Sequence, residues 1–137
     1  MTKAERETFE HFAERYRVAP AEVSRRVELA VIGGDWGANG YTTMAQASLL
    51  ARELGLRPGV RLLDLGAGRG WPGLYLAAAT GCRAVLADVP AEGLRAAAAR
   101  ARRENLADRA APVAASARGL PFAPATFDAI VHTDVLC

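Results

Sequence analysis

The chain has 137 residues, of which 51% are hydrophobic and 23% charged, so it has the length of one ordinary domain and can bury a core instead of staying disordered. Its net charge is only +2, no apolar run approaches the ~20 residues of a membrane-spanning helix, and the charged amino terminus lacks the apolar core of a signal peptide. The two cysteines, Cys82 and Cys137, are not spaced for metal binding, which indicates a reduced, cytoplasmic protein without a metal site.

Three helices are predicted before the first strand. Apolar residues recur at helical spacing over residues 3–17, and a second helix begins at Pro20. The apolar residues of this second helix share one face: Val23, Val27, Ala30 and Val31. After a glycine-rich link, Thr43 is the expected N-cap of a third helix and Gly55 its C-cap.

From residue 60 onward, strands alternate with helices. The predicted strands are residues 60–65, 82–88, 110–116 and 126–134. The helices between them cover residues 71–80 and 90–105. Alternation at this spacing is typical of an α/β fold with a doubly wound parallel sheet and right-handed crossovers. Arginines that alternate with alanines in residues 95–105 are interpreted as a solvated helix face, and a nucleic-acid-binding patch is the alternative.

The stretch "LLDLGAGRGWPGLYLA" indicates a ligand site. In an α/β sheet the ligand lies beyond the carboxyl ends of the strands, and the first strand ends at Leu65, directly before "GAGRG". Glycines permit positive φ and let the backbone approach a ligand closely. The helix that follows turns its free N–H groups and positive dipole end toward the same place.

The residues around these glycines discriminate between ligands. A dinucleotide-binding loop has the pattern G-x-G-x-x-G, but here the last position is Trp71, which leaves no room for a pyrophosphate. A phosphate-binding loop ending in G-K-[ST] is also missing from the sequence. Asp64 would repel a phosphate, whereas it would complement a ligand that carries an amine or a sulfonium.

The segment Asp64-Leu65-Gly66-Ala67-Gly68-Arg69-Gly70 resembles motif I, D/E-x-G-x-G-x-G, of the class I S-adenosylmethionine-dependent methyltransferases. The resemblance implies a Rossmann-like domain that binds S-adenosyl-L-methionine and releases S-adenosyl-L-homocysteine. It also implies that the loop packs against the methionine part of the cofactor and that Asp64 helps to hold the ammonium group. The loop residues concerned are Gly66, Ala67, Gly68 and Gly70.

Two further positions support a nucleoside cofactor. Asp88 ends the second strand and can accept hydrogen bonds from both ribose hydroxyls, with Val89 beside it; the alternative is that Asp88 caps the next helix. The segment "AASARGLPFAPATFDAIV" resembles the family's "GDAxxLPFxxxxFDxV". By this match Ser116 and Ala117 form the adenine-contacting turn, with Ser116 where the family has an aspartate.

Candidates for catalysis follow the fourth strand. His132 is a candidate general base because its ordinary pKa lies near neutrality; the alternative is that its backbone positions the cofactor amine. Asp134 could orient a substrate, or it could cap a following helix. The resemblance also implies that residues 1–42 form a helical lid, from which Tyr41 or Thr42 reaches the cofactor carboxylate; alternatively, the aromatic residues of that loop close the core.

The family's sheet has seven strands in the order 3-2-1-4-5-7-6, and residues 43–137 account for only the first four. We therefore expect an incomplete domain that lacks strands five to seven, with the contiguous order 3-2-1-4. Strand four would be an edge with unpaired backbone groups. This edge suggests a truncated chain, or self-association that completes the sheet with another copy.

The predicted function is methyl transfer to a small-molecule acceptor. Nucleic-acid methyltransferases often carry N/D-P-P-Y/F after strand four, where this chain has "HTDVLC", so nucleic acid is not the expected partner. Two alternatives remain: a cofactor-binding remnant or assembly module without catalysis of its own, and an NAD(P)-dependent oxidoreductase. Trp71 speaks against the oxidoreductase.

Overall fold

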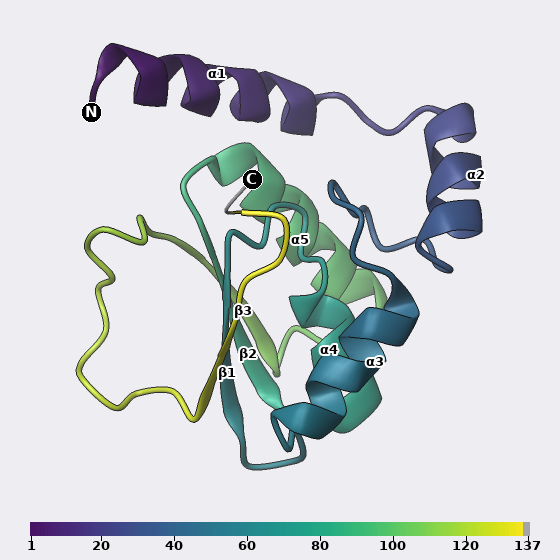
Figure 1. Cartoon of the computed structure of the whole chain (residues 1–137), viewed down its shortest axis with the longest axis vertical. Coiled ribbons are helices and arrows are strands. Elements are labelled where there is room, and N and C mark those ends of the chain that lie inside the picture. Colours follow the sequence, from purple (N-terminus) through teal and green to yellow (C-terminus); the bar gives the residue numbers. More distant parts are fainter. Residues whose placement is uncertain (136–137) are drawn as a thin grey trace.

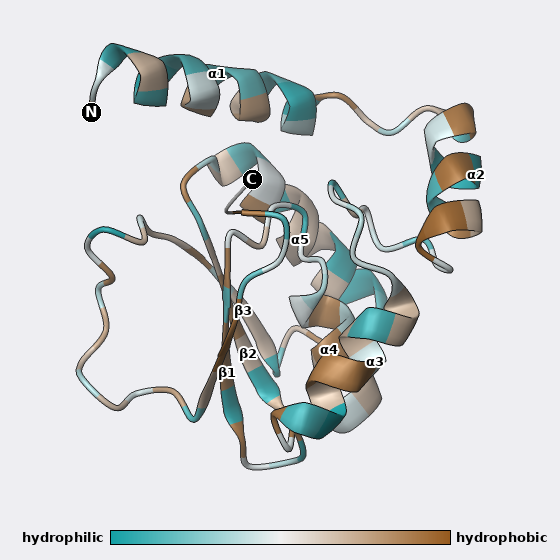
Figure 2. Cartoon of the chain, in the orientation of Figure 1, coloured by the Kyte–Doolittle hydropathy of each residue, from teal (hydrophilic) through white to brown (hydrophobic). Residues whose placement is uncertain are grey.

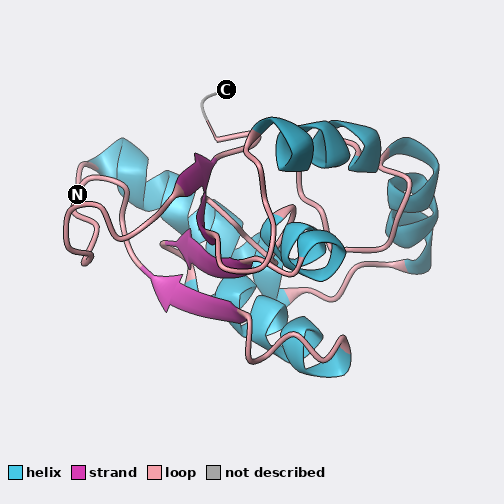
Figure 3. Ribbon diagram, turned by 90° about the horizontal axis from the view of Figure 1, so that it is seen from below, coloured by secondary structure: helices cyan, strands magenta, loops and turns pink. Residues whose placement is uncertain are grey.

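The computed structural model describes residues 1–135, and a four-stranded parallel sheet lies at its centre (Figure 3). Its strands are β1 (Arg61–Leu65), β2 (Arg83–Asp88), β3 (Ala110–Ala114) and β4 (Ala129–Val131). Their spatial order is β3-β2-β1-β4, which confirms the predicted order. Because all four strands are parallel, their carboxyl ends share one edge.

Helices cover one face of this sheet. The crossover helices α4 (Gly73–Thr80) and α5 (Ala91–Arg103) pack on the strands, and α3 (Met44–Glu53) packs against α4. Figure 1 shows these three helices on one side and the loop of residues 115–128 on the other. The core between helices and sheet is built largely from leucines and alanines, among them Leu62, Leu74, Leu76, Leu86 and Ala97.

Helix α1 (Lys3–Arg17) lies across the carboxyl edge of the sheet and contacts α5 (Figure 1). It begins with a capping box, in which the Thr2 hydroxyl accepts from the Glu5 N–H and the Glu5 carboxylate accepts from the Thr2 N–H, as its sequence favours. Only Ala13 of this helix is buried. Polar links therefore contribute much of its attachment to the sheet domain.

The short helix α2 (Glu22–Val31) turns its apolar face to solvent. Val23 is 70% and Val27 56% exposed, and the brown turns of α2 stand apart from the sheet in Figure 2. The buried residue of this helix is Glu28, whose Oε1 accepts from the backbone N–H of Trp36 at 2.8 Å and of Ala38 at 3.1 Å. These hydrogen bonds fix the side of α2 that carries Glu28 against the loop that follows the helix, whereas Arg25 and Arg26 remain exposed.

Several predicted boundaries shift. Strand β4 ends at Val131, three residues before the predicted end, and α4 begins at Gly73 with Pro72 as its N-cap. Thr43 is confirmed as the N-cap of α3, where it forms a capping box with Gln46. The C-cap is Leu54 and not the predicted Gly55, which follows it with φ 61°. The predictions for Cys137 lie outside the described residues. Within residues 1–135, no helix is long and apolar enough to cross a bilayer.

Strand β4 is an edge of the described sheet, because it pairs only with β1. Its Ile130 side chain points away from the core and is 56% exposed. Asp128, which precedes the strand, accepts hydrogen bonds from the backbone and guanidinium of Arg61. The amino end of β4 is thus fixed to β1.

We expect E28A to destabilise the fold by about 1–3 kcal/mol, because two partly buried backbone donors lose their acceptor. E28Q keeps an acceptor oxygen and should recover part of the loss. Glu53, an exposed residue at the end of α3, offers a control: E53A should leave the urea midpoint nearly unchanged. Equal midpoints for E28A and E53A would contradict the role assigned to Glu28.

Candidate functional site

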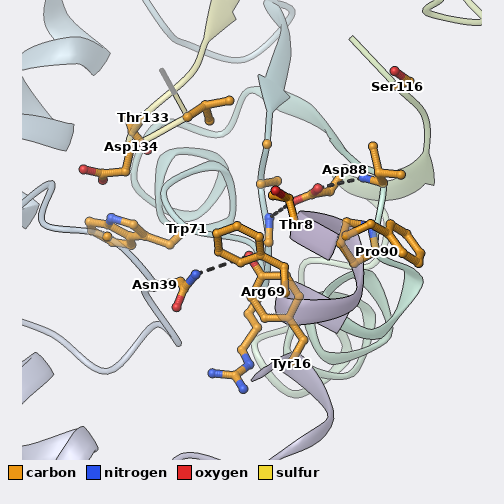
Figure 4. Close-up of a pocket in the computed structure, with 18 of the residues that line it drawn as sticks. Thr8, Tyr16, Asn39, Arg69, Trp71, Asp88, Pro90, Ser116, Thr133 and Asp134 are labelled. Carbon is orange, nitrogen blue, oxygen red and sulfur yellow. Dashed lines mark hydrogen bonds between the residues drawn. The ribbon is translucent and has the colours of Figure 1, made fainter. Parts of the chain in front are cut away.

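A cavity of about 790 Å³ opens at the carboxyl edge of the sheet, beneath α1. Its walls come from the loops that follow all four strands, from α1 and from the loop before α3. In Figure 4, Trp71 and Asp134 stand on one side of it, Asp88 and Pro90 on the other. The volume lies within the range of small-molecule and cofactor sites.

The glycine loop forms the floor of this cavity. Gly66, Gly68 and Gly70 have φ of 79°, 52° and 100°, a region that residues with a side chain rarely adopt. Gly66, Ala67 and Gly68 line the cavity. A Cβ on Gly66 would lie 2.4 Å from Val135 and one on Gly68 2.7 Å from the Tyr16 hydroxyl. The bare backbone at these two positions lets neighbouring segments approach.

Gly70 is part of the same motif but does not line the cavity. A Cβ there would lie 2.4 Å from Leu74 Cδ1 and 3.3 Å from Ala97 Cβ. Because Gly70 has no side chain, the chain can turn into α4 here and α5 can pack close to the turn. The geometry thus gives Gly70 a packing role, and its predicted contact with the cofactor stays a prediction.

Asp88 ends β2 and faces the cavity. Its Oδ2 accepts from Gly68 N at 2.7 Å and its Oδ1 accepts from Val89 N at 2.7 Å. Burial raises the pKa of this carboxyl, and the two backbone hydrogen bonds oppose the rise. The carboxylate therefore joins the loops after β1 and β2. Helix α5 has Pro90 as its N-cap, with no side-chain cap, so the alternative role of Asp88 as that cap is not what the structure has.

Asp64 lies behind the glycine loop and does not line the cavity. It is 1% exposed, and its Oδ2 accepts from Gly73 N, the first residue of α4, at 2.8 Å. Among the described residues its Oδ1 has no hydrogen-bond partner. Burial raises the pKa of Asp64 from 3.8 to about 8, because a carboxylate is costly to keep away from water. Burial therefore favours the protonated form of this carboxyl.

The predicted adenine turn lies at the far end of the cavity. Ser116 and Val89 line it, whereas Ala117 does not. The Ser116 hydroxyl accepts from the Arg118 N–H at 3.2 Å. Arg118 in turn pairs with Glu5 of α1. The loop after β3 is thereby linked to the helix above it.

Asp134 lines the cavity and holds the loop before α3. Its Oδ2 accepts from Tyr41 N at 3.2 Å, from Thr42 N at 3.3 Å and from the Thr42 hydroxyl at 2.9 Å. Tyr41 itself is 83% exposed, and neither its side chain nor His132, which is exposed, lines the cavity. Of the two candidates for catalysis, the predicted base His132 and the predicted substrate-orienting residue Asp134, only Asp134 lines the cavity.

Sequence reasoning missed two polar residues of the cavity wall. The Asn39 side-chain amide donates to the Tyr16 hydroxyl at 3.5 Å (Figure 4), and both residues line the cavity. Trp71 also lines it, and its indole N–H donates to the Thr42 carbonyl at 3.1 Å. The spacing of Tyr16 indicates only a helix face, so nothing local could reveal that its hydroxyl meets Asn39.

Within residues 1–135, no three side chains of His, Cys, Asp or Glu lie together in a group that could hold a metal ion. The polar groups at the cavity are carboxylates, hydroxyls, an amide, bare backbone and the guanidinium groups of Arg69 and Arg118. Such a set can bind the hydroxyls and charged groups of a small polar ligand against an apolar wall.

Comparisons with known proteins agree with this geometry. Residues 62–137 match a family model described as a methyltransferase domain. A curated relative, sterol methyltransferase-like 1 of Botryococcus braunii, is 29% identical over 102 residues, which are 71% of this chain and 26% of that protein.

Two solved structures, both complexes with S-adenosyl-L-homocysteine, are also similar. A S-adenosylmethionine-dependent methyltransferase from Geobacter sulfurreducens is 26% identical with a TM-score of 0.60, over 68% of this chain and 37% of that one. One from Thiobacillus denitrificans shares the fold, at 20% identity and a TM-score of 0.63, over 85% of this chain and 45% of that one. The chain thus spans about a quarter to under half the length of these relatives.

We expect G70A to destabilise the fold by about 2–4 kcal/mol, because the new methyl group meets Leu74 and because φ is positive. Gly119 provides the control, since a Cβ there meets no atom within 4 Å. G119A should therefore leave stability close to that of the wild type. Urea unfolding of both variants checks this, and equal midpoints would refute the packing role.

The raised pKa of Asp64 predicts an unusual pH dependence. The folded protein keeps a proton on Asp64 up to about pH 8, whereas the unfolded chain loses it near pH 4. Stability should therefore fall as pH rises between these values, by at most about 1.4 kcal/mol per pH unit from this group, and level off above pH 8.

The variant D64N isolates this contribution. An asparagine keeps an acceptor for Gly73 N and carries no titrating proton, so the decline should be absent from it. Asp88 and the exposed carboxyls titrate in both proteins, so their contributions cancel in the difference. The measurement is the free energy of unfolding in urea from pH 4.5 to 8.5. Parallel profiles for wild type and D64N would contradict a protonated Asp64.

Proposed function

The chain belongs to the methyltransferase-domain family, in its class I S-adenosylmethionine-dependent group, and we propose from this premise that it binds S-adenosyl-L-methionine and methylates a small-molecule acceptor. The observation that carries the proposal is the meeting of the bare glycine loop with Asp88 in one cavity. Gly66 and Gly68 expose backbone, and Asp88 presents a carboxylate held in place by two N–H groups.

The cavity fits such a cofactor. Its volume of about 790 Å³ accommodates a nucleoside that carries an amino-acid chain. Each oxygen of Asp88 accepts one backbone N–H and retains lone-pair capacity for a ribose hydroxyl. Val89 and Ser116 would flank the base, and the backbone of Gly66–Gly68 would contact the methionine part.

Two residues predicted to contact the cofactor, Asp64 and Tyr41, do not line the cavity. Asp64 could act on the ammonium group only across the glycine loop, through its unpaired Oδ1. The Tyr41 side chain would have to turn from solvent toward the cavity. Both contacts remain predictions, as does a role for His132 through its backbone.

When bound, the cofactor supplies an electrophilic methyl group on a sulfonium. The protein's part is to position the acceptor and to exclude water, for which α1 and Trp71 form the walls. An acceptor hydroxyl or amine must also lose a proton. His132, the predicted base, does not line the cavity, so we propose Asp134 for this role, although its Oδ2 already accepts from Thr42.

The small-molecule acceptor is supported by the size of the cavity, about 790 Å³, and by the sterol methyltransferase-like relative. We also propose a cytoplasmic location, from the cysteine usage, and no nucleic-acid partner. Self-association through the edge of β4 is a further proposal, supported by the exposed Ile130. The alternative function is a cofactor-binding module without catalysis of its own, which would use the same cavity.

The decisive experiment is calorimetric titration of the purified chain with S-adenosyl-L-homocysteine, with NADH as the control ligand. We expect micromolar binding of the first, about 8 kcal/mol, and none of the second. Binding of NADH alone would establish the oxidoreductase alternative instead. Binding of S-adenosyl-L-homocysteine without methyl transfer to any acceptor tested would favour the cofactor-binding module.

The variant D88A tests the site itself. Its control is D108A, because Asp108 precedes β3 and therefore lies at the amino ends of the strands, away from the cavity. We expect D88A to weaken binding at least about tenfold, as the loss of a charge-assisted hydrogen bond predicts. The loss should be much smaller for a 2′,3′-dideoxy analogue, which lacks the hydroxyls that Asp88 would bind. An equal loss for both ligands would contradict a ribose contact.

A further inference from the structure

Helix α1 is tied to the loops that follow three different strands. Arg69, in the loop after β1, donates to backbone carbonyls at the end of the helix. Glu92, just after the loop that follows β2, accepts from Arg17 at 2.9 Å. Arg118, after β3, pairs with Glu5. These three links, which hold the helix over the cavity, are all charged or charge-assisted.

The contacts of Arg69 differ from the two ion pairs. Its Nη2 donates to the Arg15 carbonyl at 2.8 Å and to the Val18 carbonyl at 2.7 Å. Its guanidinium lies 5.5 Å from the centre of the Tyr16 ring. These partners belong to the last turn of α1 and its C-cap residue Val18, where backbone carbonyls lack N–H donors within the helix and the dipole favours a cation.

Arg69 is also only partly exposed, which strengthens these contacts. Its pKa is lowered, mainly by burial, yet a guanidinium remains charged at any physiological pH. The side chain passes beside Gly37, where an added Cβ would lie 3.4 Å from Arg69 Cβ and 3.5 Å from its Cδ. Arg69 thus touches both the end of α1 and the loop that returns from α2.

Tyr16, whose ring lies beside the Arg69 guanidinium, also reaches the floor of the cavity. The Tyr16 hydroxyl sits over Gly68, 2.7 Å from the place of a Cβ, and Gly68 N donates to Asp88. Arg69 is the next residue after Gly68. A ligand that contacts the glycine loop therefore contacts the segment whose neighbouring side chain holds α1.

We propose that Arg69 is a positioning residue that couples the glycine loop to α1, so that the helix stays closed over the cavity and slows the release of the bound ligand. The side chain acts by holding the last turn of α1 and the ring of Tyr16. The effect of Arg69 on ligand release rests on the proposed function. The closure of α1 over the cavity does not, because it concerns the protein without ligand.

Closure is tested first, by trypsin cleavage of the ligand-free protein at the Arg17–Val18 bond, which lies between the two carbonyls that Arg69 holds. Cleavage after Arg26, in α2, serves as the reference within each sample. We expect R69A to raise the relative rate at Arg17 about tenfold or more, because two charge-assisted hydrogen bonds are lost.

The variant R69K keeps the charge, but its ammonium ends about one C–N bond, roughly 1.3 Å, short of the guanidinium Nη2 and cannot stack on Tyr16. It should lie between R69A and the wild type, and it decides the matter if R69A fails to fold. The matched control is R52K, in α3, whose side chain is exposed. Wild-type cleavage in R69K and R69A would overturn the closure role.

Coupling to the ligand is tested by the kinetics of S-adenosyl-L-homocysteine binding. R69A should raise the dissociation rate about tenfold and change the association rate much less, since the contacts that hold a complex together act mainly on dissociation. A residue that only stabilised the fold would lower the active fraction and leave the dissociation rate unchanged. An unchanged rate, with faster cleavage at Arg17, would overturn the coupling.

The two arms separate this inference from the proposed function. If the wild type does not bind S-adenosyl-L-homocysteine, the proposed cofactor is wrong, and the coupling to it falls with it. The cleavage rates of the ligand-free variants still decide whether Arg69 holds α1 closed.

Discussion

The turn between β1 and α4 is the constraint on which the rest of the structure depends. Its glycines do more than reverse the chain, because each missing side chain makes room for a different segment. Val135 comes from beyond β4, Tyr16 from α1 and Leu74 from α4, and a Cβ in the turn would lie 2.4–2.7 Å from each of them. Substitution of any of these glycines would push apart segments that meet at this turn.

Three carboxyl groups hold the segments that meet at the carboxyl ends of the strands. Asp64 holds the start of α4, Asp88 holds Gly68, and Asp134 holds the loop at Thr42. Each lies in or just beyond a strand and binds a neighbouring loop through its backbone or hydroxyl. The loops are therefore ordered by the protein's own hydrogen bonds, which lowers the entropy that a ligand must remove when it binds.

The sequence predicts this edge well where the signals are local. The strands and the glycine loop follow from hydrophobic runs and from the position of glycines after a strand, and the position of Asp88 at the end of β2 follows from the same rule. The order of the strands follows from the resemblance to the family. The orientation of α2 could not be predicted. Its apolar valine face favours burial, but Glu28 accepts from two backbone N–H groups of the loop that follows α2, and the valines therefore face solvent. The exposed position of His132 depends on where β4 ends, which a periodic pattern does not fix.

The cavity roof is beyond sequence reasoning for a different reason. Tyr16 and Asn39 meet across 23 positions of the chain, and Arg69 reaches Val18 across 51. Tertiary structure alone brings such partners together. The roof also differs physically from the core: α1 buries one alanine, whereas the sheet buries leucines on the side that faces α4 and α5. Opening the roof breaks polar links and leaves that core intact, so the helix can move while the sheet stays folded.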